Sequence, residues 1–246
     1  MKRKTKTEKR FYRKISYPKG LISFQVSVKE TDLWISAIEN LSRHAETLIL
    51  DARNQVESYI KRYPEFLNTL LPWHEDMFAP PVVKEMIKAS RIASVGPMSA
   101  VAGAIAEYVG KGLLRFSDEV IVENGGDVFL MLKRDADILV YSGNRYEVEL
   151  RLKKDMMPAG VCSSSGKIGH SLSFGNADVV TVFSNSASLS DATATAIANR
   201  IKKEGDLKKL GKWASQIKGI FGVLAIVEGN MSIWGEVEIL CIRKQL

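Results

Sequence analysis

The first third of the chain combines one alternating stretch with one long helical pattern. Residues 21–28 (LISFQVSV) alternate loosely between apolar and polar side chains, which is typical of a strand. Thr31 and Asp32 follow it and offer a helix N-cap. Over residues 41–60, apolar side chains recur every three or four positions, which predicts one face of a long amphipathic helix. Pro64 ends or restarts that helix.

The middle of the chain predicts a loop and then two helices. Residues 70–81 (LLPWHEDMFAPP) contain three prolines and an aromatic cluster, so we expect a loop packed across the surface. A short helix is predicted over 82–90. Gly96 and Pro97 suit the start of another helix. Its first part, residues 99–106, is almost all small side chains, which let a helix lie very close to another backbone or a ligand.

The second half of the chain is rich in β-strand patterns. Asn124-Gly125-Gly126 separates two β-rich runs, a strong signal for a hairpin. Gly229-Asn230 is expected to link the last two strands. The predicted strands are 119–123, 127–132, 138–141, 146–152, 160–162, 179–183, 220–227 and 237–242, and further helices are predicted over 190–201 and 207–217. We therefore expect an α+β or α/β fold with antiparallel sheets flanked by helices.

Two of the predicted helices resemble each other. Residues 100–107 (AVAGAIAE) and 192–199 (ATATAIAN) are identical at five of eight positions, and a β-rich run follows each. Two interpretations stay open: Ala-rich helices that share the same packing chemistry, or two related halves that meet at a cleft. A cleft between halves is a natural ligand site.

The net charge of +7 is concentrated at one end of the chain. Residues 1–14 carry eight basic side chains and one acidic one, and the remaining residues carry 27 of each. A nucleic-acid-binding module usually spreads a basic stripe across its folded face, so nucleic acid is not an expected partner. We expect a solvated basic arm over residues 1–15, with weak contact to anionic partners as the alternative. A single domain is expected over residues 16–246.

Cysteine content and hydropathy indicate the compartment. Cys162 and Cys241 provide no disulfide framework and no zinc spacing, and Cys162 is expected to be a buried small hydrophobe. No run approaches the roughly 20 apolar residues that cross a bilayer. No apolar stretch follows the charged start, as it would in a secretory signal. We therefore expect a cytoplasmic protein.

Asp191 and Thr195 are the first candidates for chemistry. They lie four residues apart in a predicted helix, so both side chains face the same way. A carboxylate and a hydroxyl near backbone carbonyls make a hard-oxygen site of the kind that Mg²⁺ prefers. The alternative is purely structural: Ser188, Ser190 or Asp191 caps this helix, and Asp191 in its first turn suits the helix dipole.

Two loops are candidates for holding phosphate. The residues Asn124–Asp127 form either a plain turn or a backbone that approaches a bound nucleotide. Ser163–Gly166 is either a flexible loop or a source of N–H groups and hydroxyls for phosphate oxygens. His170 lies in the same polar stretch and is either hydrogen-bonded or catalytic. No P-loop, GxGxxG or HExxH motif is present.

The order of these segments resembles the ApbE family, the FAD:protein FMN transferases, and in particular its cytosolic branch. That family has a small-residue helix start, an N-x-G-G-D hairpin, a T-S-G loop, a His-containing segment and an A-D-A-x-x-T helix. The corresponding segments here are GPMSAVAG at 96–103, ENGGDVFL at 123–130, CSSSG at 162–166, His170 and SDATATA at 190–196. The resemblance covers roughly residues 90–243.

The resemblance implies an ApbE-like fold and a phosphoryl-group transfer. In the family, FAD lies in a cleft, Mg²⁺ bridges its pyrophosphate to the protein, and a hydroxyl of an acceptor protein attacks the FMN phosphorus as AMP leaves. By position, Asp191 and Thr195 would be the Mg²⁺ ligands, and His170 and Asp191 the catalytic residues. The implied cofactor-binding residues are Ser99, Asn124, Gly125, Gly126, Asp127, Ser164, Ser165 and Gly166.

Two segments depart from the family pattern. The Lys of the family's IAKG segment has no counterpart in GPMSAVAG, and HIIDP is replaced by HSLSF. Three hypotheses follow: Mg²⁺-dependent FMN transfer, a flavin- or nucleotide-binding protein without transfer, or the same scaffold acting on another small molecule. The small-residue helices could also pack between subunits of a homo-oligomer.

Overall fold

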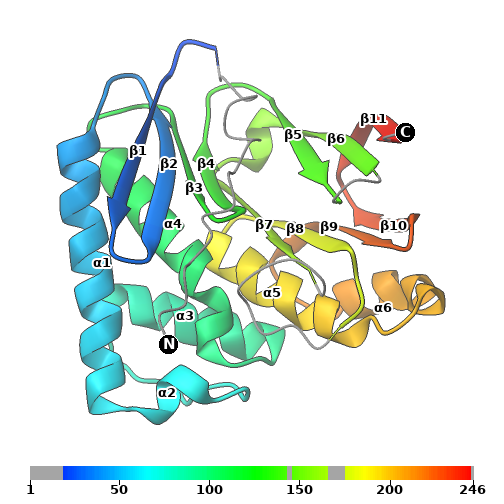
Figure 1. Ribbon diagram of the computed structural model, residues 1–246, viewed down its shortest axis with the longest axis horizontal. Coiled ribbons are helices and arrows are strands. Elements are labelled where there is room, and N and C mark those ends of the chain that lie inside the picture. Colours follow the sequence, from blue (N-terminus) through cyan, green and yellow to red (C-terminus); the bar gives the residue numbers. More distant parts are fainter. Residues whose placement is uncertain (1–18, 143–145, 166–174, 245–246) are drawn as a thin grey trace, which may run out of the picture.

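An eight-stranded antiparallel sheet runs through the middle of the molecule (Figure 1). The computed structural model describes residues 19–142, 146–165 and 175–244. The sheet has the order β1-β2-β3-β4-β7-β8-β9-β10. Its strands are β1 (Ile22–Val28), β2 (Thr31–Ala37), β3 (Val120–Asn124), β4 (Asp127–Met131), β7 (Ala159–Ser164), β8 (Val179–Ser184), β9 (Ile220–Val227) and β10 (Asn230–Gly235).

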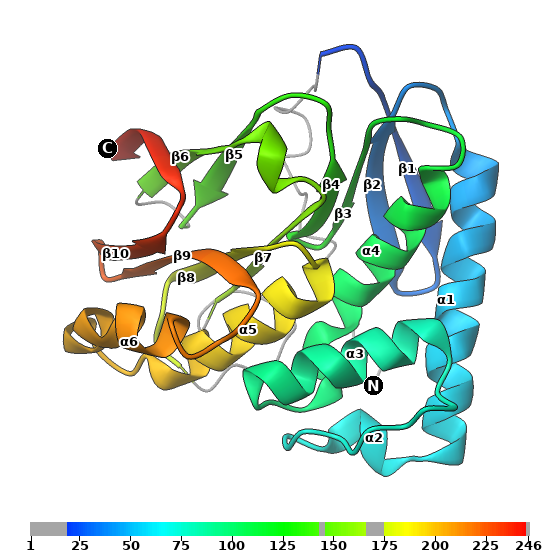
Figure 2. The ribbon, with the colours of Figure 1, turned by 180° about the vertical axis from the view of Figure 1, so that it is seen from behind.

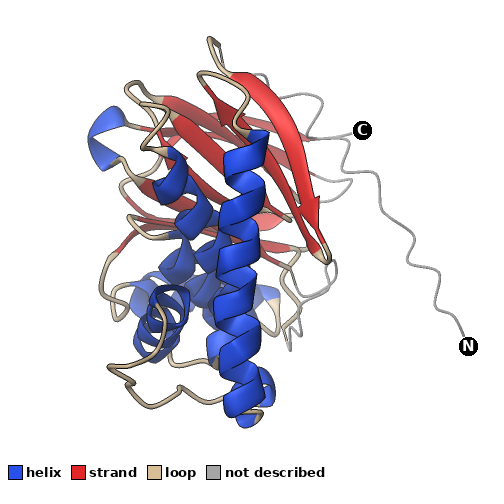
Figure 3. Cartoon of the chain, turned by 90° about the vertical axis from the view of Figure 1, so that its left-hand side faces the viewer, coloured by secondary structure: helices blue, strands red, loops and turns tan. Residues whose placement is uncertain are grey.

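Helices cover one face of this sheet and a small second sheet covers part of the other (Figures 1 and 2). The small antiparallel sheet has the order β11-β6-β5, formed by β11 (Glu238–Lys244), β6 (Tyr146–Leu152) and β5 (Ala136–Tyr141). Viewed from the side, the helices gather on a single face (Figure 3). They are α1 (Ser42–Arg62), α2 (Glu65–Asn68), α3 (Pro81–Ala93), α4 (Val101–Leu113), α5 (Ala187–Arg200) and α6 (Leu210–Ala214), with short 3-10 turns η2 (Pro97–Ala100), η3 (Lys154–Met156) and η4 (Glu204–Lys209).

The two covering layers explain why the central strands are apolar throughout. Every residue of β8 (VVTVFS) is buried. Val180 and Val182 face the core beneath α5 and α6, while Val179 and Phe183 face the core beneath the small sheet. A strand that is buried on both faces loses the polar alternation of a half-exposed strand. The predicted antiparallel sheets flanked by helices are therefore confirmed.

The sheet consists of two halves with the same order of elements. In the first half, β1 and β2 are followed by helices and then by β3 and β4; in the second, β7 and β8 are followed by helices and then by β9 and β10. Within each half the four strands are neighbours, and β4 and β7 join the halves. This repetition supports the interpretation that residues 100–107 and 192–199 belong to related halves. A ligand cleft between them stays a prediction.

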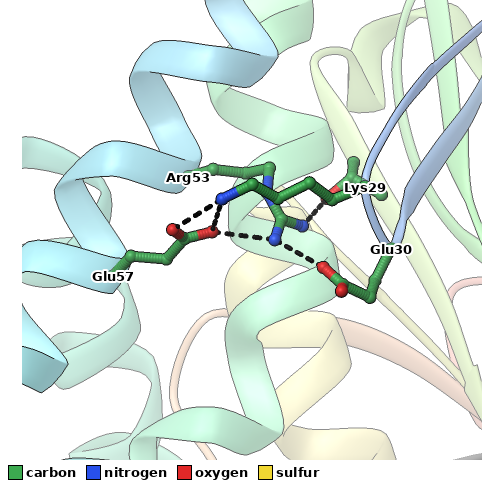
Figure 4. Close-up of polar contacts among 5 residues, drawn as sticks. Lys29, Glu30, Arg53 and Glu57 are labelled. Carbon is green, nitrogen blue, oxygen red and sulfur yellow. Dashed lines mark hydrogen bonds and ion pairs between the residues drawn. The ribbon is translucent and has the colours of Figure 1, made fainter.

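A polar network ties the β1–β2 turn to α1 (Figure 4). The Arg53 guanidinium donates to Glu57 at 2.8 Å, to Glu30 at 2.6 Å and to the Thr31 hydroxyl at 2.8 Å. Lys29 pairs with Glu57 at 2.9 Å. Lys29 and Arg53 hold the pKa of the Glu57 carboxyl below its ordinary value. Exposed pairs of this kind contribute about 0.2–1 kcal/mol each, so the network orients the hairpin more than it stabilises the fold.

Three sequence predictions about elements are wrong. Thr31 and Asp32 do not cap a helix but begin β2. The Gly229-Asn230 turn leads into β10, whereas β11 crosses over to pair with β6 in the small sheet. The helix predicted over 190–201 begins earlier, at Ala187.

The predicted basic arm, residues 1–15, lies outside the described residues. Within the described ranges, no single helix is long and apolar enough to cross a membrane. Pro81–Ala93 and Pro97–Leu113 reach that length and composition only when taken together, across a bend of 107°.

Candidate functional site

Three backbones meet where α4, α5 and β7 touch. A Cβ atom at Gly103 in α4 would lie 2.2 Å from the carbonyl oxygen of Ala187 and 2.9 Å from the Cβ of Asp191. A Cβ at Gly160 in β7 would lie 2.4 Å from the backbone nitrogen of Ala187. Real side chains do not come this close, so only glycine fits at either position. The small-residue faces therefore pack against each other inside the chain and are not available for pairing subunits.

Asp191 caps α4 rather than its own helix. The N-cap of α5 is Ser186, whose hydroxyl accepts from Leu189 N. Asp191 lies beyond the first turn of α5, and its Oδ2 accepts from Gly103 N at 2.9 Å. The start of α4 has no side-chain cap of its own, and a carboxylate is favourable at that positive helix end. The expectation that Ser188, Ser190 or Asp191 caps α5 is therefore wrong.

Glu107, which the sequence did not single out, fixes the N-terminus of α5. Its buried carboxylate accepts from the Ser186 hydroxyl at 2.8 Å and from Ser188 N at 3.1 Å. Lys111, one turn further along α4, pairs with it at 2.6 Å. Glu107 could have been recognised from the sequence as a single acidic residue in the mostly small and apolar run AGAIAEYVG. A carboxylate on a buried helix face needs a partner from another element.

The Asn124–Asp127 hairpin is tied to the same helix start. The Asn124 side-chain amide donates to the carbonyl of Ala102 at 3.0 Å. Gly125 and Gly126 both have positive φ, 69° and 110°, so the turn itself requires glycine. Gly126 N donates to Glu123 Oε1 at 2.9 Å, which occupies that N–H within the protein. The turn interpretation is confirmed, and the hairpin also reaches the candidate site through Asn124.

Asp127 and Asp191 form an acidic pair in which Asp127 is buried and Asp191 is partly exposed. Asp127 is 9% exposed, and among the described residues its Oδ1 has no hydrogen-bond partner. Burial raises the pKa of Asp127 to about 7, although the Cys162 thiol and the backbone N–H of Ser163 lower it. Burial raises the pKa of Asp191, and the charge of Asp127 raises it further. The N–H groups at the start of α4 lower this pKa and so offset part of the increase. No basic side chain is among these influences in the described part of the chain.

Cys162 lies beside this pair as a structural residue. Its thiol is buried and donates to the carbonyl of Ala187 at 3.2 Å. Burial, followed by the charges of Asp127 and Asp191, raises the pKa of the thiol well above its ordinary value. A thiol that resists ionisation is a poor nucleophile, so the expectation of a buried small hydrophobe is confirmed.

The other predicted site residues lie in four different places. Thr195 lies one turn after Asp191 on α5 and is partly exposed. Ser99 uses its hydroxyl locally, donating to the carbonyl of Gly96 at 2.6 Å. Ser164 is buried at the end of β7, and Ser165, which follows it, is partly buried. Gly166 and His170 lie outside the described residues.

The types of side chain at Asp127, Asp191 and Thr195 are compatible with a hard divalent cation, whose binding here stays a prediction. Two carboxyls and the Thr195 hydroxyl are oxygen donors of the kind that Mg²⁺ prefers. The unpartnered Oδ1 of Asp127 lacks the counter-charge that a buried carboxylate needs. Among the described residues, no three His, Cys, Asp or Glu side chains gather as a complete metal cage. A cation here would therefore take the rest of its ligands from water and from a bound anion.

Comparison with known proteins places the chain in a family. The family model described as AbpE bacteria matches residues 13–218. The UPF0280 protein MJ1526 of Methanocaldococcus jannaschii is 39% identical over 222 residues, covering 87% of this chain and 90% of the relative. A UPF0280 protein of Methanothrix thermoacetophila is 39% identical over 199 residues, covering 78% and 83% of the two chains.

Solved structures share the fold at low sequence identity. The flavin transferase ApbE from Vibrio cholerae superposes with a TM-score of 0.59 at 14% identity, covering 89% of this chain and 98% of that one. The flavinyl transferase ApbE of Pseudomonas stutzeri, in its apo form, gives a TM-score of 0.57 at 11% identity, covering 87% and 94%. The predicted ApbE-like fold is therefore confirmed.

Proposed function

Because this chain belongs to the AbpE bacteria family of ApbE-like proteins, we propose that it is a flavin-transferase-like protein. In this proposal it binds FAD together with Mg²⁺ and transfers FMN to a hydroxyl group of an acceptor protein. The observation that carries the proposal is the acidic pair of Asp127 and Asp191, in which the Asp191 carboxylate caps the start of α4. Two neighbouring carboxylates without a basic neighbour in the described chain repel each other, so they take up a proton or a cation, and the proposal assigns a cation.

Each described site residue has a definite part in this proposal. Asp191 and Thr195 would hold the cation from one face of α5, and Asp127 would add a second carboxylate. A bound Mg²⁺ supplies neutralisation of phosphate charge and a fixed orientation for the pyrophosphate. The glycine contact at position 103 and the Glu107 anchor set the distance between α4 and α5. The protein's own contribution is thus a rigid, partly buried carboxylate at a helix N-terminus.

A second candidate function is flavin or nucleotide binding without transfer. The sequence favours it at the segments around the transferred group, where IAKG and HIIDP have no full counterparts. The acidic pair and the hairpin belong to both candidates. The two therefore differ only in the chemical step.

Release of AMP from FAD distinguishes the candidates. The full-length protein is incubated with FAD and Mg²⁺, with and without a Ser- or Thr-containing protein extract as acceptor, and AMP is measured by chromatography. Transfer predicts AMP that depends on Mg²⁺ and is lost in Asp191→Asn, while the exposed Asp137→Asn behaves as wild type. Flavin binding without AMP supports the second candidate. If the protein neither binds flavin nor releases AMP, both candidate functions are contradicted.

A further inference from the structure

The segment between α2 and α3 carries an unusual concentration of exposed apolar side chains. Of the thirteen large hydrophobic residues that are exposed in the described part of the chain, five fall within residues 67–78. They are Leu67, Leu70, Leu71, Met77 and Phe78, and we call them the apolar ridge. Phe78 is 98% exposed and Met77 72%. Single exposed apolar residues are common, but concentrated ones mark interaction surfaces.

The ridge stands on a rigid support. The Trp73 indole donates to the Tyr59 hydroxyl at 3.2 Å, and that hydroxyl donates to Asp76 Oδ2 at 2.9 Å. The other Asp76 oxygen accepts from Phe78 N at 2.9 Å. These two donors hold the pKa of the Asp76 carboxyl below its ordinary value, with the Phe78 N–H contributing most. The backbone of Phe78 is therefore fixed while its ring faces solvent, and binding would cost little further ordering.

An aromatic cluster buries the inner side of this support. Trp73 packs edge-on against Phe66 with ring centroids 5.4 Å apart, and Tyr59 packs against Phe66 at 4.9 Å. Arg91 of α3 pairs with Glu75 at 2.8 Å and closes the far end of the loop. The backbone of this segment lies at the lower edge of the molecule in Figures 1 and 2. The fold thus holds these apolar side chains on the outside of the molecule. A mobile loop could instead have turned them inward.

A groove of about 550 Å³ lies directly beside the ridge. Met77, Ile87 and Ile92 form its apolar part. Its charged lining consists of three acidic residues, Glu75, Asp76 and Glu85, and three basic ones, Lys84, Lys88 and Arg91. The rim is therefore neutral overall. It offers no dominant charge to a strongly acidic or basic partner.

We propose that this surface is the interface of a symmetric homodimer, in which the Phe78 side chain of each copy enters the groove of the other. A two-fold interface uses the same patch on both subunits, so a side chain that projects from the patch can be buried only if the same patch also contains a recess. The ridge and the groove meet that requirement. The balanced charges also meet it, because acidic and basic side chains can face each other across the axis without net repulsion. The inference does not depend on flavin binding.

The interface would also support the candidate site from behind. The carbonyl oxygen of Thr69, at the base of the ridge, lies 1.9 Å from where a Cβ at Gly96 would be. Gly96 precedes η2, and its carbonyl accepts from Ser99. Pairing of two copies would therefore hold the turn that leads into α4.

Sedimentation velocity of the full chain over a range of concentrations tests the proposal. The molar mass obtained for the wild type should be twice the chain mass of 27.3 kDa. Phe78→Ser should raise the dimer dissociation constant by roughly 100-fold or more, because the ring is lost twice in a symmetric interface. Its melting temperature, measured where both proteins are monomeric, should match wild type, because the ring is exposed in the monomer. Leu139→Ser replaces an apolar side chain that is 46% exposed on β5, away from the ridge, and should leave the dimer intact.

Other occupants of the surface give different results, and each overturns the proposal. A wild-type monomer whose melting temperature drops in Phe78→Ser indicates that another segment of the same chain covers the ridge. A wild-type monomer with an unchanged melting temperature in the variant assigns the ridge to a different protein. A dimer that persists in Phe78→Ser has its interface elsewhere.

Discussion

Replacing Gly103 by alanine tests the packing on which the candidate site depends. The added methyl group would lie 2.2 Å from the carbonyl oxygen of Ala187 and 2.7 Å from its carbonyl carbon. Both atoms are backbone, so no side-chain rotation relieves the clash and α4 must move away from α5. That movement lengthens the 2.9 Å hydrogen bond from Gly103 N to Asp191. The substitution should therefore weaken both the fold and the site.

The size of the effect follows from two opposing contributions. Overpacking of a well-packed core costs about 1–3 kcal/mol and sometimes more. Alanine is favoured over glycine inside a helix by about 0.5–1 kcal/mol. A backbone clash lies at the upper end of the overpacking range, about 2–3 kcal/mol, so the expected net loss for Gly103→Ala is roughly 1–2.5 kcal/mol. A loss of this size lowers the melting temperature of a chain of this length by about 2–10 °C.

Gly112→Ala in the same helix is the matched control. Its Cβ would lie 2.6 Å from a Cδ atom of Leu48, a partly exposed side chain that can rotate away. This variant should be as stable as wild type or more stable by up to about 1 kcal/mol. Urea unfolding of the two variants gives the comparison directly. Equal stability of Gly103→Ala and Gly112→Ala would refute the close α4–α5 contact.

Two further predictions concern the buried acids. The ordinary pKa of Asp127 is 3.8, and its pKa in the folded protein is about 7. Between these pH values the folded protein holds a proton that the unfolded chain has lost. The free energy of unfolding therefore falls as the pH rises through this range. In metal-free buffer, the unfolding free energy of Asp127→Asn should therefore rise relative to that of wild type between pH 4 and pH 7, by up to about 4 kcal/mol. A difference between the two proteins that does not change with pH would contradict this. Glu107→Ala should cost roughly 2–5 kcal/mol in unfolding free energy, because Ser186, Ser188 N and the α5 terminus lose a buried charged acceptor; a loss below about 1 kcal/mol would contradict the anchor.

Local patterns were sufficient where an element's stability depends on its own buried face. The helix α1 was predicted because apolar side chains recur at helical spacing over residues 41–60, and its buried stripe is formed by Ala45, Ile49, Ala52, Val56 and Tyr59. The β3–β4 hairpin was predicted because its turn needs positive φ at Gly125 and Gly126. In both, the chemistry that decides the structure lies within a few residues.

The sequence predictions fail where a distant contact or an unusual residue determines the local structure. The β1–β2 turn places Lys29 at a φ of 52°, without the glycine or asparagine that would announce it, so Thr31 and Asp32 were interpreted as a helix cap. The start of α5 was misplaced because Glu107, some 80 positions earlier, binds Ser186 and Ser188.

The candidate site was partly predictable for the same reason. Its oxygen-bearing residues were recognisable from type and spacing. The sequence did not show that Asp191 caps α4 or that Asp127 is buried beside Cys162, because α4, α5, β4 and β7, which are distant in the sequence, together create that environment.

Calorimetric titration with FAD, with and without Mg²⁺, tests the central claim most directly. The account predicts that FAD binds to the wild type and that binding requires Mg²⁺. It also predicts that Asp191→Asn weakens binding by roughly 10- to 100-fold while circular dichroism shows an intact fold. FAD binding that ignores both Mg²⁺ and Asp191 would contradict the proposed cation site. No FAD binding in either condition would contradict the flavin proposal itself and leave only the ApbE-like fold.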